Sequence, residues 1–184
     1  MVLVLASNSP RRRQILADAG IPFQVRAPTV LEERRAGESA DAYVRRLAKE
    51  KAFAVAIAPG EIVLGADTVV VVDEEIIEKP RDAADAHRMV KLLSGKEHQV
   101  ITGICLRKDS QTILDTAITL VRFVELSEQQ VADYVASGEP MDKAGGYAIQ
   151  GQACKFIDRI VGCYFNVVGL PVALVYQHLK QLGW

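Results

Sequence analysis

The sequence predicts an α/β fold on a mixed sheet, in a chain of 184 residues that we expect to form one domain over 1–184. Three observations predict this class. Short apolar runs of strand length lie between longer segments whose apolar residues recur at helical spacing. Serine or aspartate stands at the start of four of those longer segments, as at helix N-caps. The two kinds of segment interleave without strict βα alternation, which favours a mixed sheet.

The N-terminal part of the chain predicts three strands and two helices. Ser9 is a good N-cap, and Pro10 stands at the position where helices tolerate proline best. Gly20 is the expected stop of this first helix. Ser39 can cap a second helix, on whose apolar stripe Lys51 also falls. The expected strands are residues 2–6, 23–26 and 61–72, and the expected helices are residues 10–19 and 39–58.

The C-terminal part predicts three helices, three strands and two loops. Asp82 caps a helix, and Ser127 with Gln130 forms a capping-box pattern before a short helix that ends at Gly138. Two segments rich in glycine or turn residues are expected to be loops. The expected helices are 82–93, 127–138 and 171–182, the strands are 98–106, 112–124 and 156–160, and the loops are 140–151 and 162–171.

Composition excludes several classes of protein. The net charge is −1 and aromatic residues are 6%, so no global field draws the chain onto nucleic acid. No apolar run reaches the roughly 20 residues of a membrane span, and no secretory leader is visible. The three cysteines have no metal-ligand spacing and suggest buried or half-buried thiols in a reducing compartment. We therefore expect a cytoplasmic protein without nucleic-acid or membrane partners.

The first candidate site is the segment Ser7-Asn8-Ser9-Pro10-Arg11-Arg12. A strand leads into small residues that open a helix, whose free N–H groups and positive dipole end can bind an anion. Arginine in a first turn is unfavourable for the dipole, which makes sense where a phosphate chain binds. A solvated basic helix start would give the same pattern. We note Ser7, Ser9, Arg11 and Arg12 as candidate phosphate-binding residues.

The second candidate is Asp67 with Thr68, in the middle of the long apolar strand 61–72. A buried carboxylate is costly unless it is paired, hydrogen-bonded or bound to metal. Asp67 could hold Mg²⁺ or orient an attacking water, whereas the structural alternative is a carboxylate that bonds loop N–H groups.

Several other charged or polar residues would indicate a functional site only if the fold brings them together. Taken singly, Lys51, Lys79 and Lys143 would be surface lysines, and Glu32 with Glu33 a surface loop. Gln150 lies in a glycine-rich stretch and offers both a donor and an acceptor, which suits the edge of a base.

As an ordered set, these segments resemble the Maf family of nucleotide pyrophosphatases. The resemblance covers nearly the whole chain, although Asn8 replaces a commonly smaller residue and Arg13 adds a third arginine. The matching segments are Leu5–Arg12, Gly65–Val70, Glu78–Pro80, Leu93–Gly95, Asp142–Gly151 and Asn166–Pro171.

The resemblance implies a twisted mixed sheet flanked by helices, with two lobes around a deep cleft, related to the inosine triphosphatase fold. It implies a homodimer and cleavage of a nucleoside triphosphate between its α and β phosphates, assisted by Mg²⁺ or Mn²⁺. Asp67 matches the catalytic carboxylate, and Glu33, Lys51 and Lys79 match supporting positions, with Glu33 and Asp67 expected to hold metal. Arg11, Thr68 and Gln150 match the substrate-selecting positions in the combination of the branch acting on dTTP and UTP.

Two alternatives stay open at this stage. One is a hydrolase of inosine or methylated purine triphosphates on the same fold. The other is a nucleotide-binding regulator of septum formation with little turnover. The presence of Asp67 argues against this second alternative, because a protein that only binds nucleotide needs no water-activating carboxylate.

Overall fold

The computed structural model describes residues 1–184 and contains one seven-stranded sheet. The strand order is β2-β1-β3-β5-β6-β7, and β4 pairs with β3 beside this path. β1 runs parallel to β2 and β3, whereas β4 is antiparallel to β3 and β7 to β6, so the predicted mixed sheet is confirmed. The strands are β1 Val2–Ala6, β2 Phe23–Val25, β3 Glu61–Val72, β4 Glu75–Ile77, β5 Glu97–Lys108, β6 Gln111–Phe123 and β7 Ile157–Val161.

The four predicted capping residues all cap helices. Ser9, Ser39, Asp82 and Ser127 each accept a hydrogen bond from a backbone N–H in the first turn, and Gln130 completes the capping box. None of the helices combines the length and the apolar character that a membrane crossing requires. The α-helices are α1 Pro10–Asp18, α2 Ala40–Phe53, α3 Ala83–Leu93, α4 Glu128–Ala136, α5 Tyr164–Val168 and α6 Val172–Gln181.

Several boundaries differ from the sequence expectation. α2 ends at Phe53 and not near Ala58, because Val55 leaves the helix to join a buried cluster with Ala48 and Ala52. The expected loop 162–171 contains α5, which begins where the Thr119 hydroxyl bonds both the N–H and the carbonyl of Cys163 at 3.1 Å. The expected loop 140–151 contains the short 3₁₀ helices η1 Glu139–Asp142 and η2 Ala144–Gly146, and η3 Gln152–Phe156 follows it.

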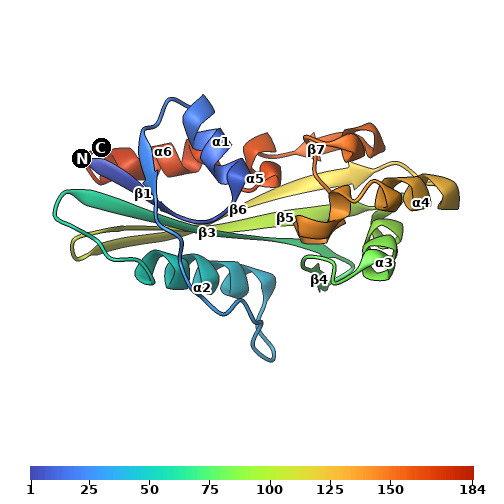
Figure 1. Cartoon of the computed structure of the whole chain (residues 1–184), viewed down its shortest axis with the longest axis horizontal. Helices are drawn as coiled ribbons and strands as arrows, with labels where there is room; N and C mark the ends of the chain where they lie inside the picture. Colours follow the sequence, from blue (N-terminus) through green and yellow to red (C-terminus); the bar gives the residue numbers. More distant parts are fainter. The chain divides into compact units, whose positions relative to one another are not determined.

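The chain forms two compact units, which we describe separately. The first unit comprises Met1–Thr68, Thr102–Ala117 and Gly169–Trp184, and the second comprises Val69–Ile101 and Ile118–Val168. In the first unit, α2 covers one face of the sheet while α1 and α6 cover the other, and the two chain ends lie side by side (Figure 1).

Helix α2 lies unusually close to the sheet of the first unit. A Cβ atom on Gly65 of β3 would stand 2.1 Å from the Ala48 carbonyl oxygen, and one on Gly103 of β5 would stand 2.5 Å from the Val44 carbonyl oxygen. No side chain fits at such distances, so the two glycines are required by space and not by backbone angle. This close packing sets the distance from α2 to the polar residues of β3.

The second unit has its own apolar core, rich in rings. Phe123 packs edge to face on His98 and Tyr147, and Tyr134 packs in the same way on Phe156. The T-shaped arrangement is the favoured geometry of aromatic pairs. Helix α3 lies beside α4 over this core (Figure 1).

Candidate active site

Asp67 lies in the middle of β3 and is 6% exposed. Burial raises the pKa of its carboxyl group, because a low-dielectric surrounding disfavours the charged form; the cations of Lys51 and Arg12 oppose that effect. The predicted burial of this carboxylate is therefore confirmed. It is accompanied by two cations rather than by loop N–H groups.

Lys51 is the direct partner of Asp67. It comes from the last turn of α2, and its Nζ lies 2.6 Å from Asp67 Oδ1 and 2.9 Å from Glu32 Oε1. The lysine lies on the apolar stripe of α2, and this stripe faces β3 at the point where β3 carries Asp67. One ammonium group thus joins the buried carboxylate of Asp67 to the exposed one of Glu32, and it is at Asp67 that an unpaired charge would be costly.

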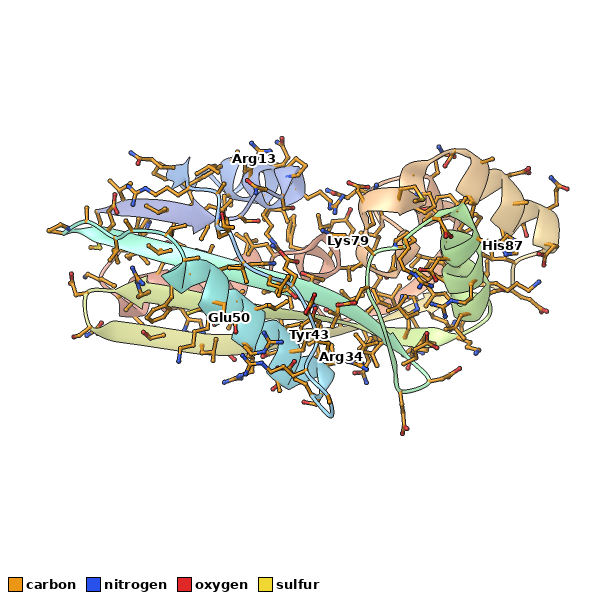
Figure 2. The ribbon with its side chains drawn as sticks, turned by 60° about the horizontal axis from the view of Figure 1, so that its bottom comes forward. Arg13, Arg34, Tyr43, Glu50, Lys79 and His87 are labelled. Atoms are coloured by element: carbon orange, nitrogen blue, oxygen red, sulfur yellow. The ribbon has the colours of Figure 1, made fainter.

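The loop that carries Glu32 is fastened to α2 by its backbone. The Tyr43 hydroxyl donates to the Glu32 carbonyl at 3.3 Å, and Arg46 donates to the Glu33 carbonyl at 2.9 Å. Arg46 also binds both oxygens of Glu38 at 2.7 Å, which lowers the pKa of that carboxyl to about 2. Figure 2 shows Tyr43 on α2 and Arg34 on the loop that precedes it. Glu32 and Glu33 are both exposed, and Glu32 is the residue whose carboxylate meets Lys51.

Arg12 is buried, and its guanidinium bonds protein oxygens. Its Nε donates to the Gly169 carbonyl at 2.8 Å, and one terminal nitrogen donates to the Ala66 carbonyl at 2.8 Å and to Ser7 Oγ at 3.3 Å. The other terminal nitrogen donates to Thr68 Oγ1 at 3.0 Å. Burial lowers the pKa of this guanidinium, and the charge of Asp67 opposes the shift. The geometry makes Arg12 a connector between α1, β3 and the segment before α6.

Thr68 stands next to Asp67 and shares its hydroxyl among three partners. Thr68 Oγ1 accepts from Arg12, lies 2.9 Å from Thr102 Oγ1 and lies 3.5 Å from the Gly169 carbonyl. Gly169 has φ +127°, a backbone conformation that other residues rarely adopt. Thr102 and Gly169 were not singled out from the sequence, since neither residue type signals a site by itself.

The other predicted residues of the N-terminal motif play different parts. The Ser9 hydroxyl caps α1, and Ser7 Oγ accepts from the Ser9 N–H at 3.2 Å as well as from Arg12. Arg11 is half-buried, whereas Arg13 is exposed and points away from the sheet (Figure 2). The first unit therefore brings together Ser7, Arg12, Lys51, Asp67 and Thr68.

Three candidates belong to the second unit. Lys79 is exposed on the segment after β4 (Figure 2). Gln150 is exposed between η2 and η3. Lys143 donates to the Glu139 carbonyl at 2.6 Å and to the Asp142 carboxylate, as a local ion pair would. The structure leaves Lys79 and Gln150 available to solvent within their own unit.

The chain contains no group of three or more histidine, cysteine or carboxylate side chains placed to hold a metal ion. The first unit does place two carboxylates, Asp67 and Glu32, within 2.9 Å of one ammonium nitrogen. Mg²⁺ is commonly held by one or two carboxylates together with water and substrate phosphates, so this donor set fits such an ion. Of the cysteines, Cys105 is buried and Cys163 half-buried as expected, but Cys154 is exposed, because it lies on the outer side of η3.

Comparison with known proteins covers the whole length of the chain. The family model described as Maf-like protein matches residues 2–182. The dTTP/UTP pyrophosphatase of Koribacter versatilis (strain Ellin345) is 48% identical over 184 residues, which are 100% of this chain and 95% of the relative. The dTTP/UTP pyrophosphatase of Salmonella typhimurium (strain LT2) is 51% identical over 98% of this chain and 93% of the relative.

A looser likeness extends to the Ham1 protein of Staphylococcus aureus, with 15% identity and a TM-score of 0.47 over 67% of this chain and 72% of that one. The full-length match and the relatives at about half identity settle the family. This chain belongs to the Maf-like protein family.

Proposed function

We propose that this chain hydrolyses dTTP and UTP between the α and β phosphates, releasing the nucleoside monophosphate and pyrophosphate. The full-length relatives named dTTP/UTP pyrophosphatase support the substrate class. The observation that carries the chemistry is Asp67, a buried carboxylate held 2.6 Å from an ammonium group on a rigid strand. Neither a purine substrate nor a purely regulatory role has a comparable observation in its favour.

Asp67 is the proposed group that receives the proton of the attacking water. The water oxygen bonds to the α-phosphorus while the bond from that phosphorus to the bridging oxygen breaks, and pyrophosphate leaves. A carboxylate whose pKa is raised by burial accepts a proton more readily near neutral pH than an exposed one. Lys51 holds the carboxylate in place and offsets negative charge beside it.

The basic groups have distinct proposed parts. Arg11, at the first turn of α1, and Lys79 are proposed to neutralise phosphate oxygens, with Ser7 and Ser9 lining the start of α1. Arg12 is proposed to act through other residues, since its guanidinium is bonded to Ala66, Gly169 and Thr68. In this proposal Arg12 fixes the loop-to-helix entry, and Arg11 faces the nucleotide.

Base choice is proposed to depend on Arg11, Thr68 and Gln150. The Thr68 hydroxyl accepts a hydrogen bond from Arg12, and its own hydrogen has only a long contact of 3.5 Å to the Gly169 carbonyl and a shared one to Thr102, so we propose that it turns to donate to the base. A pyrimidine with exposed carbonyl oxygens suits a donor of this kind. Hydrogen bonds to a base discriminate strongly, because the wrong base leaves a buried polar group without a partner.

A divalent cation, Mg²⁺ or Mn²⁺, is the proposed cofactor, with Asp67 as one ligand. When bound it would withdraw charge from the phosphate oxygens as a Lewis acid. The second carboxylate is Glu33 by family resemblance, whereas the geometry favours Glu32, which shares Lys51 with Asp67. Comparing the Mg²⁺ dependence of Glu32→Gln and Glu33→Gln decides between them, since only loss of a ligand raises the metal concentration needed for half-maximal rate.

The test of the proposed reaction is product identification with dTTP, UTP, ITP and 7-methyl-GTP in the presence of Mg²⁺. We expect monophosphate and pyrophosphate from the two pyrimidine nucleotides, and a loss of at least about 10²-fold in kcat for Asp67→Asn. Diphosphate and phosphate as products would refute α–β cleavage. A preference for either purine nucleotide would refute the pyrimidine assignment. Sizing of the purified chain tests the implied homodimer separately.

A further inference from the structure

The carboxylate of Glu139, in the second unit, lies against the segment that carries Gln150. Its Oε2 accepts from the Gln152 backbone N–H at 2.8 Å, and its Oε1 accepts from the Tyr134 hydroxyl at 3.0 Å. Glu139 is half-buried, and Tyr134 is 2% exposed. Each oxygen of the carboxylate therefore has a defined partner, one of them on the backbone two residues beyond Gln150.

Gly151 explains how close this approach is. A Cβ atom on Gly151 would stand 2.4 Å from Glu139 Oε1 and 2.5 Å from Oε2. The φ angle of Gly151 is −104°, which any residue can adopt, so a side chain at position 151 would have to displace the Glu139 carboxylate and not the backbone. The group that the Gly151 backbone approaches is therefore the Glu139 carboxylate.

The turn around Gln150 is closed by its own backbone. The Gly151 N–H donates to the Ala148 carbonyl at 3.0 Å. Glu139 bonds the backbone two residues after Gln150, and Tyr134 holds the Glu139 carboxylate. The side chain of Gln150 is left exposed in the middle of this braced turn.

Glu139 is itself fixed at its backbone. Its N–H donates to Ser137 Oγ at 3.2 Å, and its carbonyl accepts from Lys143 Nζ at 2.6 Å. The side chain therefore starts from an anchored position at the end of α4. A hydrogen bond from a neutral N–H to an anchored carboxylate is among the stronger ones in proteins.

We propose that Glu139 and Tyr134 are positioning residues that hold Gln150 in the orientation with which it reads the base. This inference rests on the proposed function, because it needs Gln150 to contact the nucleotide. Neither residue has to touch the substrate. Their effect is to limit the freedom of residues 148–152, so that the Gln150 amide meets one base edge and not another.

The kinetic test compares dTTP with 7-methyl-GTP for Glu139→Gln, Tyr134→Phe and Gln150→Ala. Glutamine keeps the size of Glu139 but replaces one acceptor oxygen by a donor, and phenylalanine removes only the hydroxyl. We expect the ratio of kcat/KM for dTTP to that for 7-methyl-GTP to fall about tenfold in each variant, mainly through a higher KM for dTTP. Asp133→Asn is the matched control, because this exposed carboxylate on α4 bonds only a neighbouring glutamine side chain.

The double variant Glu139→Gln with Gln150→Ala separates positioning from general damage. If Glu139 acts through Gln150, adding Glu139→Gln to Gln150→Ala changes the ratio by less than about twofold. An undiminished effect in the double variant overturns the proposal. If Gln150→Ala alters the ratio but Glu139→Gln and Tyr134→Phe do not, the positioning role is wrong while the proposed function stands. If Gln150→Ala has no effect, the proposed role of Gln150 fails.

A second measurement does not depend on turnover. Amide hydrogen exchange of the nucleotide-free protein reports the Gln152 N–H directly, and we expect at least about tenfold faster exchange in Glu139→Gln, the equivalent of losing a hydrogen bond to a charged group. The amides of α2 serve as the internal reference. If the Gln152 N–H is equally protected from exchange in Glu139→Gln and in the wild type, the proposed positioning role of Glu139 is wrong, whatever the enzyme assay gives.

Discussion

Replacing Lys51 by methionine removes the ammonium group from a pair in which both side chains are less than a tenth exposed. Methionine keeps the length and the apolar stem of lysine, so it tests charge more than packing. Asp67 then stays buried on β3 without its ion-pair partner. Breaking a buried pair from one side costs about 3–5 kcal/mol. The cost arises here because Asp67 loses its directly bonded cation and keeps only the more distant charge of Arg12.

The opposite replacement, Asp67→Asn, should cost less. Lys51 would keep Glu32 at 2.9 Å, and the asparagine oxygen can still accept its hydrogen bond. We expect about 1 kcal/mol for this variant. The asymmetry follows from the geometry, since Lys51 has two carboxylates and Asp67 has one ammonium group.

Urea unfolding gives the free energy of unfolding of the wild type, both single variants and the double variant, which together form a double-mutant cycle. The measurements are made with EDTA and without nucleotide. The double variant should be about 2 kcal/mol more stable than the sum of the single effects predicts. For a chain of this length, Lys51→Met alone should lower Tm by roughly 6–20 °C. Additive effects, or equal losses for the two single variants, would refute the claim that this pair is coupled and asymmetric.

Three further predictions concern other contacts. Gly65→Ala should destabilise the protein by more than about 2 kcal/mol in urea unfolding, because its Cβ would stand 2.1 Å from the Ala48 carbonyl oxygen. Gly60→Ala, at φ +80° in open space, should cost only about 1 kcal/mol, and equal costs for the two variants would contradict the close packing of α2. Burial lowers the pKa of His98 to about 4, so the unfolded chain binds more protons than the folded one between pH 6.5 and 4. The free energy of unfolding should therefore fall by up to about 3 kcal/mol as the pH is lowered through that window, and an equal fall in a His98→Gln variant would refute the role of His98. Arg12→Lys should lower the free energy of unfolding by about 2 kcal/mol and weaken the preference for dTTP through Thr68, whereas Arg13→Lys, at an exposed position, should change it by less than about 0.5 kcal/mol. Equal losses of stability in the two variants would show that the buried hydrogen bonds of Arg12 are unimportant.

The elements that were predictable from the sequence are those governed by local chemistry. Ser9 followed by Pro10, and Ser127 with Gln130, fix helix starts through hydrogen bonds within one turn, and the structure confirms both. The continuous apolar run 61–72 indicated a strand buried on both faces, and β3 has those bounds.

The elements that were not predictable depend on contacts between distant residues. The end of α2 is set by the burial of Val55 in a tertiary cluster, and α5 is started by a Thr119 hydroxyl 44 residues away in sequence. Asp67 and Lys51 were each identifiable as unusual in an apolar setting, but their pairing requires knowing that α2 lies on β3. Arg12 carried the right signal, an arginine at a helix start, yet the carbonyl groups of Ala66 and Gly169 that it binds are invisible to any side-chain motif.

Because the first unit is built from three separate segments of the chain, its contacts cannot all form until the last of them has been translated. Of its three segments, Gly169–Trp184 is translated last, and the hydrogen bond from Arg12 to the Gly169 carbonyl joins residues 157 positions apart. A nascent chain lacking that segment has Asp67, Lys51 and Thr68 in its sequence but lacks helix α6 and the acceptor that fixes Arg12. The contacts around Asp67 are therefore complete only after residues 169–184 have been translated, so shorter nascent chains carry Asp67, Lys51 and Thr68 without the acceptor that fixes Arg12.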